Sequence, residues 1–266
     1  MTGLWAAADA PAAVQDDAVR TALCGVLLAW ADDELILGHR HSEWTGFAPD
    51  IESDVALSSI AQEELGHARV LYEQVADATG TTPDALAFGR GPQAFRNAVL
   101  VEHPNDDWGF TVVRAWLYDH ADAVRLADLA AAPLGPFAAL ARALQREEKY
   151  HLLFSDAWLV RLARAGHEAS ARLQAALEAA WPDALGLFEE TDDHAHLVAS
   201  GLLPAGASAQ RGRFEGAVRP RLEELGLRPP LAAAATGGRR GRHTAALHAL
   251  LEEMTSVWRT DPAARW

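Results

Sequence analysis

Apolar residues recur at helical spacing along most of this chain. In long stretches rich in Ala, Leu, Glu and Arg they fall at i, i+3, i+4 and i+7, whereas the alternation typical of strands is nearly absent. The pattern predicts four long helices, over about 14–44, 51–78, 107–131 and from "APLGP" to about 165. Glycine and proline in "TGFAPD" and "TGTTPD" end the first two helices.

The last third of the chain, about 167–266, shows a weaker helical pattern. It predicts helices near 169–180, 183–200 and 210–225, then a mobile loop in "RPPLAAAATGG" and a final helix that ends near 258. No linker separates these segments from the rest. We therefore expect one all-α domain over 1–266, with a four-helix bundle at about 14–165 and an extension of additional C-terminal helices packed on it.

Two of the long helices contain a glutamate three residues before a histidine, Glu64 with His67 and Glu148 with His151. Composition alone produces about one such pair in a chain like this, so the spacing is weak evidence by itself. A carboxylate, however, precedes each pair at nearly the same interval, because Glu34 lies 30 residues before Glu64 and Asp119 lies 29 before Glu148. The chain repeats a unit of one acid followed by E-x-x-H.

Helical spacing places each of these acids among apolar residues, on a face expected to be buried. Burying unpaired carboxylates costs several kcal/mol each, so something positive must compensate them. Two divalent metals with two histidines are a known solution for four carboxylates in a four-helix bundle. The candidate ligands are Glu34, Glu64, His67, Asp119, Glu148 and His151.

A polar core without metal is the alternative. Crowded carboxylates can bind protons, or they can pair with a nearby cation such as Arg69, Arg114, Arg125 or Lys149. The doubled glutamates leave a further choice open, because Glu63 and Glu147 become the inward members if the helices rotate by one position.

The formal net charge of −14 and the isoelectric point near 5.1 oppose binding to nucleic acid or to an anionic membrane. The single cysteine, Cys24, excludes an intramolecular disulfide and a cysteine-based metal cluster. The N-terminal segment "MTGLWAAADAPAAVQDD" has no basic and apolar leader pattern, and no segment offers 18 apolar residues free of charge. We expect a cytoplasmic protein.

One basic segment interrupts this acidic chain. "GGRRGRHT" contains Arg239, Arg240 and Arg242 ahead of the last helix. The cluster is expected to contact an acidic partner or an anionic group such as a coenzyme A phosphate, unless it is simply a solvated loop.

Several segments together resemble one protein family. "LILGHRHSEW", "EELGHARVLYE", "WLYDHADA", "REEKYHLLFSDAWLVRL" and "TGGRRGRHTAALHALLEEM" are similar to the C-type chains of the bacterial phenylacetyl-CoA epoxygenase. The resemblance implies a ferritin-like bundle that acts as a structural, noncatalytic subunit and needs no cofactor of its own. It implies a catalytic A-type chain as partner, which carries a di-iron centre and epoxidises phenylacetyl-CoA with O2, in a homodimer or hetero-oligomer.

The sequence departs from this implication at the candidate metal ligands. A structural subunit is expected to have lost ligands, yet a full set can be written here, with Asp119 shorter than the usual glutamate. We therefore expect a weak or vestigial di-metal site, with residual di-iron as one outcome. A di-iron protein with its own O2 chemistry and a free-standing iron-binding bundle are the alternatives.

Overall fold

The computed structural model describes residues 4–6 and 12–262, so the N-terminal residues 1–3 and 7–11 and the end of the predicted extension, 263–266, lie outside it. The described residues form helices and no strands. The α-helices are α1 (Asp17–Ser42), α2 (Ile51–Thr79), α3 (Pro83–Phe88), α4 (Trp108–Ala131), α5 (Pro136–Arg164), α6 (His167–Gly186), α7 (Asp192–Ala199), α8 (Ala207–Glu224), α9 (Ala245–Met254) and α10 (Ser256–Thr260). The short 3-10 helices are η1 (Leu4–Ala6), η2 (Ala12–Gln15), η3 (Pro92–Ala94), η4 (Val99–Glu102) and η5 (Gly238–Arg240).

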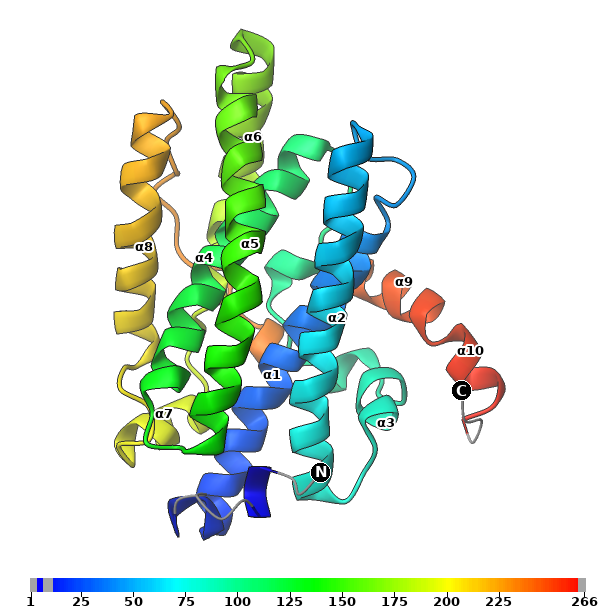
Figure 1. The fold of residues 1–266 in the computed structure, drawn as a ribbon, viewed down its shortest axis with the longest axis vertical. Coiled ribbons are helices and arrows are strands. Elements are labelled where there is room, and N and C mark those ends of the chain that lie inside the picture. Colours follow the sequence, from blue (N-terminus) through cyan, green and yellow to red (C-terminus); the bar gives the residue numbers. More distant parts are fainter. Residues whose placement is uncertain (1–3, 7–11, 263–266) are drawn as a thin grey trace.

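Four long helices form the bundle as two antiparallel hairpins, α1 with α2 and α4 with α5 (Figure 1). The all-α class predicted from periodicity and the ferritin-like bundle implied by the resemblance are confirmed. The ends of these helices lie within two residues of the predicted ones except at the start of α1. The buried apolar residues form one core that joins the four bundle helices with α6, α7, α8 and α9. Among the described residues no helix combines the length and the apolar character needed to cross a membrane.

Local sequence explains where the long helices begin and end. Asp16, Asp50 and Asp107 each cap a helix by accepting hydrogen bonds from backbone N–H groups of the first turn. Gly80 ends α2 with a φ of 71°, a left-handed conformation that favours glycine. These caps fix the starts of α1, α2 and α4, and therefore the positions at which Glu34, Glu64, His67 and Asp119 leave their helices. Helix α5, which carries the other two candidate ligands, begins at a proline without a side-chain cap.

The C-terminal third covers only part of the bundle. Helices α6 and α8 pack on α4, and α7 packs on α1. In Figure 1, α5 and α2 stand in front of α4 and α1, and no helix of the described chain lies over them. The outer faces of α2 and α5 are therefore open.

Two helix boundaries in this third differ from the predicted ones. The sequence pattern predicts a break near Pro182, but α6 continues through it to Gly186. A proline inside a helix costs about 3 kcal/mol. Trp181 and Leu185 are buried on either side of it, and each recovers roughly 1.5–3 kcal/mol by burial. The predicted final helix is instead two helices, α9 and α10, which meet at Thr255.

Candidate metal centre

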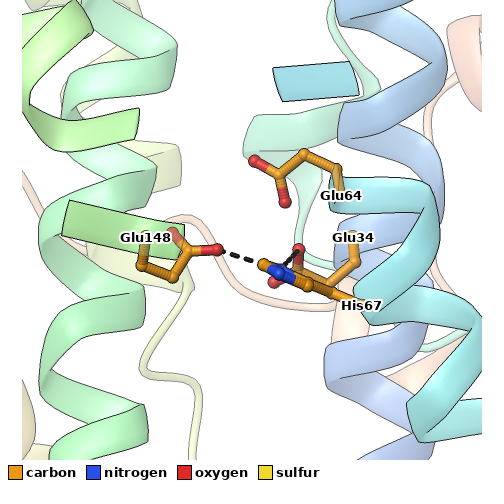
Figure 2. A group of neighbouring side chains, drawn as sticks. All are labelled: Glu34, Glu64, His67 and Glu148. Atoms are coloured by element: carbon orange, nitrogen blue, oxygen red, sulfur yellow. Dashed lines mark ion pairs between the residues drawn. The ribbon is translucent and has the colours of Figure 1, made fainter. Parts of the chain in front are cut away.

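Four of the predicted ligands meet in the middle of the bundle. Glu34 from α1, Glu64 and His67 from α2, and Glu148 from α5 point toward one another (Figure 2). One ligand atom from each lies within 4.8 Å of the others. All four side chains are buried, with exposures of 0–4%. This settles the rotation of the doubled glutamates, because Glu64 and Glu148 are the inward members.

The other two predicted ligands line the same interior. His151 Nδ1 lies 3.4 Å from Glu64 Oε1 and 3.4 Å from Glu148 Oε1. Asp119 is also buried, and its Oδ2 accepts a hydrogen bond of 2.6 Å from Ser155 Oγ. Glu64 and Glu148 thus lie between a group around His67 and a group around His151, the arrangement in which a carboxylate can bridge two metals.

A second layer of side chains holds the ligands from outside. Tyr118 Oη donates to Glu34 Oε1 at 2.7 Å, in the same way that Ser155 holds Asp119. The two histidines are held crosswise between the hairpins: His67 Nε2 lies 2.8 Å from Glu147 Oε2, and His151 Nε2 lies 2.7 Å from Glu63 Oε2. Each imidazole therefore turns its Nδ1 inward, because its Nε2 is held at the outside.

The atoms left without a hydrogen bond form a pattern. Among the six residues, the buried unpartnered atoms are Glu34 Oε2, Asp119 Oδ1, His151 Nδ1 and both carboxylate oxygens of Glu64 and of Glu148. The two outer carboxylates each have one oxygen satisfied and one free, which suits a terminal ligand. The two central carboxylates have no hydrogen bond at either oxygen, although Glu148 Oε1 lies within ion-pair distance of both histidine Nδ1 atoms. Such orphaned buried oxygens need a cation or protons, so the donor set fits two divalent metals.

Without metal, protons compensate the acids. Burial has the largest single effect on the pKa of His67 and lowers it. Hydrogen bonds and charges from Glu148 and Glu34 together outweigh burial and raise this pKa to about 12. The pKa of His151 is raised for the same reason, by Glu148 and Glu64. Burial likewise favours the neutral form of Glu148, yet the two imidazoliums lower its pKa to about 2. The metal-free centre thus contains an ionised Glu148 between two charged histidines.

Two other acids of the centre, Glu64 and Asp119, have raised pKa values. Burial, followed by the charge of Glu34, raises the pKa of Glu64 well above its ordinary value. Burial also raises the pKa of Asp119 to about 8, although His151 opposes the change. Metal binding must displace these protons, so it competes with acid.

None of the cations considered from the sequence pairs with these acids in the described structure. Arg69 is exposed and pairs with Glu73, whereas Lys149 lies over the ring of Tyr150. Arg114 donates to His103 O and Asn105 Oδ1. Arg125 pairs with Asp33 and Asp122. Of the non-metal alternatives, only protonation fits the geometry.

Sequence reasoning missed the outer layer of the centre. Ser155 follows His151 by one helical turn, so i,i+4 spacing could have suggested it. Tyr118 is next to Asp119 in sequence, and nothing in a local pattern indicates that its hydroxyl reaches α1. His41 is buried with no hydrogen bond at either nitrogen, and the charges of Arg114 and His151 add to its burial in lowering its pKa. It follows Glu34 by two turns on the same face.

The basic loop differs from its expected exposed form. Arg239 is buried, and its guanidinium donates to both carboxylate oxygens of Asp33 at 2.9 and 2.7 Å. It also donates to the carbonyls of Ala29, Arg96 and Leu187. Arg239 therefore fastens the loop to α1. Arg240 is 59% exposed in a pair with Glu189, and a partner contact stays a prediction for Arg240 and Arg242.

Fold and centre together define a ferritin-like bundle of the carboxylate-and-histidine type. The family described as phenylacetic acid catabolic protein matches residues 7–266, and this chain belongs to that family. The chain is 31% identical to the C-type subunit of 1,2-phenylacetyl-CoA epoxidase from Escherichia coli strain K12, over 92% of its length and 99% of that protein. It is 25% identical to the A-type subunit of the same organism's epoxidase, over 80% of its length and 70% of that second protein.

Proposed function

We propose that this chain is a C-type, noncatalytic structural subunit of a 1,2-phenylacetyl-CoA epoxidase and that it supports a catalytic A-type subunit. The observation that carries the proposal is the length of the match: similarity to the C-type relative extends over 99% of that protein, whereas similarity to the A-type relative covers 70% of it at lower identity. The E. coli relatives are named as subunits of one enzyme, so the A-type chain is the expected partner.

Reconstitution tests this function. The chain alone, with phenylacetyl-CoA, O2 and an electron donor, is expected to form no epoxide. Epoxide formation is expected when the A-type subunit from the organism that makes this chain is added. Turnover by this chain alone would overturn the structural role. Failure of the two chains to copurify would overturn the assignment to the complex.

A second function is supported by the orphaned oxygens of the centre. We propose that the subunit holds two divalent metals, one by Glu34 and His67 and the other by Asp119 and His151, with Glu64 and Glu148 between them. A bound di-iron pair would supply O2 activation or iron oxidation. The protein's own part is to present a neutral imidazole Nδ1 and monodentate carboxylates from fixed positions.

Elemental analysis separates the two roles. Protein purified without chelator is expected to contain up to two iron or manganese ions per chain, and Glu64→Gln is expected to lose them. Metal in the wild type without epoxide formation supports a structural metal centre. Fully metal-free protein that also takes up no added Fe(II) or Mn(II) would refute metal binding and leave the structural subunit intact as a proposal.

A further inference from the structure

Exposed apolar side chains gather around α2 and α5. Of seven large hydrophobic side chains that are exposed in the described residues, five come from the turn before α2, from the start of α2 and from the middle of α5. We call these five the α2/α5 patch: Phe47, Ile51, Val55, Tyr150 and Leu153. Their exposures are 59–80%. An apolar cluster of this kind on a protein surface marks an interaction site.

The patch is one surface, because the two helices run side by side. Arg161 of α5 pairs with Asp50 at the start of α2, and His151 reaches Glu63 further along. A cavity of about 530 Å³ opens between the helices. Ala56, Phe154, Ala157 and Trp158 form its apolar part, and the charged side chains of Asp50, Glu52 and Arg161 line its end near the start of α2. From Ile51 to the level of the His151 contact the patch extends roughly 20 Å along α2.

Within the described residues, the chain's own fold does not cover this surface. The C-terminal helices pack mainly on α4 and α1. Helix α6 also packs on one side of α5 and α3 on one side of α2, but no helix of the described residues stands in front of α2 and α5 in Figure 1. On α4 the covering helix α8 buries even a charged residue, because Asp128 is buried and accepts hydrogen bonds from Gln210 and Arg213. A surface left apolar while its neighbours are covered is typical of a contact with another chain.

Two carboxylates lie in this apolar surface. The side chains of Glu63 and Glu147 are 42% and 54% exposed, and each is fixed by a histidine of the opposite helix. They cannot turn away from an approaching partner without losing that contact. The partner must therefore bring apolar side chains together with a cation, and a second copy of this acidic chain, with a net charge of −14, is a poor match.

We propose that the α2/α5 patch is the surface on which the A-type subunit docks, through a helix that lays an apolar stripe along α2 and α5 and a lysine or arginine over Glu63 and Glu147. This inference rests on the proposed function. A standard interface buries about 800 Å² on each partner, which a helix lying in such a groove with its flanking residues can supply.

Paired serine substitutions test the surface. Ile51→Ser with Leu153→Ser is expected to raise the Kd for the purified A-type subunit by at least about tenfold, because anchors at the centre of an interface carry most of its binding energy. The matched control is Leu231→Ser with Val257→Ser, which changes the two exposed hydrophobics outside the patch and is expected to leave Kd within about twofold. All four positions are exposed, so both variants are expected to fold, as thermal melting would verify.

The charge in the patch has its own test. In Glu147→Gln the amide oxygen can still accept from His67 Nε2, but the negative charge is lost. The variant is expected to bind the A-type subunit more weakly and with a smaller dependence on salt than the wild type. Unchanged affinity and salt dependence would overturn the cationic part of the proposal.

The outcomes distinguish the surface from the function. If wild-type protein does not bind the A-type subunit, the proposed function fails. If it binds and the Ile51/Leu153 variant binds equally well, only the surface assignment fails. A third outcome is that the wild-type chain self-associates, that the Ile51/Leu153 variant is a monomer, and that both bind the A-type subunit equally well. In that case a second copy of this chain occupies the patch, and the proposal is overturned.

Discussion

Glu64 and Glu148 occupy equivalent places in the two E-x-x-H units, yet the structure predicts that in metal-free protein only the change of Glu148 to glutamine lowers stability substantially. Glu148 is ionised between two charged histidines, with its Oε1 at 3.0 Å from His67 Nδ1 and 3.4 Å from His151 Nδ1. Burial and the charge of Glu34 raise the pKa of Glu64 well above its ordinary value, which favours its neutral form. Glutamine resembles a protonated glutamic acid in shape and charge. Glu64→Gln therefore causes little electrostatic loss, whereas Glu148→Gln removes the negative charge between the two histidines.

The size of the difference follows from the pKa of Glu148. Its decrease from 4.5 to about 2 corresponds to about 3 kcal/mol of preferential stabilisation of the carboxylate in the folded protein. Removing one member of a buried ion pair costs roughly 3–5 kcal/mol in other proteins, which agrees with this value. A chain of this size loses roughly 2–4 °C per kcal/mol. We therefore expect Glu148→Gln to lower the Tm by roughly 6–12 °C, and Glu64→Gln to change stability by less than about 1 kcal/mol.

Thermal and urea denaturation near neutral pH after extensive chelation measure the difference. The same melts are then repeated with excess Mn(II). At a Mn(II) concentration of a hundred times the Kd for this metal, the wild type is expected to be stabilised by about 3 kcal/mol, and neither variant is expected to be stabilised to this extent. Equal destabilisation by the two substitutions without metal would refute the assignment of charge within the centre. Stabilisation by Glu148→Gln would refute it more strongly.

Three further predictions concern the surroundings of the centre. Tyr118→Phe removes the hydrogen bond that fixes Glu34, and we expect metal affinity to fall about 10-fold by titration with Mn(II), with unchanged affinity as the contrary result. Burial raises the pKa of Asp119 from 3.8 to about 8 in the folded chain, so the protonated Asp119 contributes to stability fully below about pH 3.8 and this contribution is lost as pH rises through about 8. The Tm of chelated protein should therefore fall as pH rises over this range, and it should fall less in Asp119→Asn. Arg239→Gln breaks a buried ion pair and should cost roughly 3–5 kcal/mol in urea denaturation. Arg240→Gln should cost less, because the Arg240 side chain is 59% exposed although its partner Glu189 is buried, and equal costs would contradict the burial of Arg239.

Periodicity is sufficient for the bundle and for four of the six inward groups, because both depend on local spacing; the two doubled glutamates are the exception. A helix turns by about 100° per residue, so the choice between Glu63 and Glu64 needs the neighbouring helix, which shows that Glu63 is the outer partner of His151. The exposed position expected for Arg239 is wrong because its partner, Asp33, lies 206 residues away in sequence. A cluster of arginines between glycines is typical of a surface loop, and no local pattern reveals that one of them enters the core.

The outer layer of the centre also offers a reason for a subunit with the proposed structural role to contain both E-x-x-H units. Helices α2 and α5 belong to different hairpins, and each hairpin is joined internally more extensively than α2 is joined to α5. The two crosswise pairs, His67 with Glu147 and His151 with Glu63, cross this boundary, and Glu148 draws both imidazoles inward. These contacts exist without metal, so the doubled glutamates can hold the hairpins together and fix the surface between α2 and α5 whether or not the centre is loaded. In this arrangement the inner glutamates, Glu64 and Glu148, line the centre, and the outer glutamates, Glu63 and Glu147, fix the shape of the α2/α5 surface.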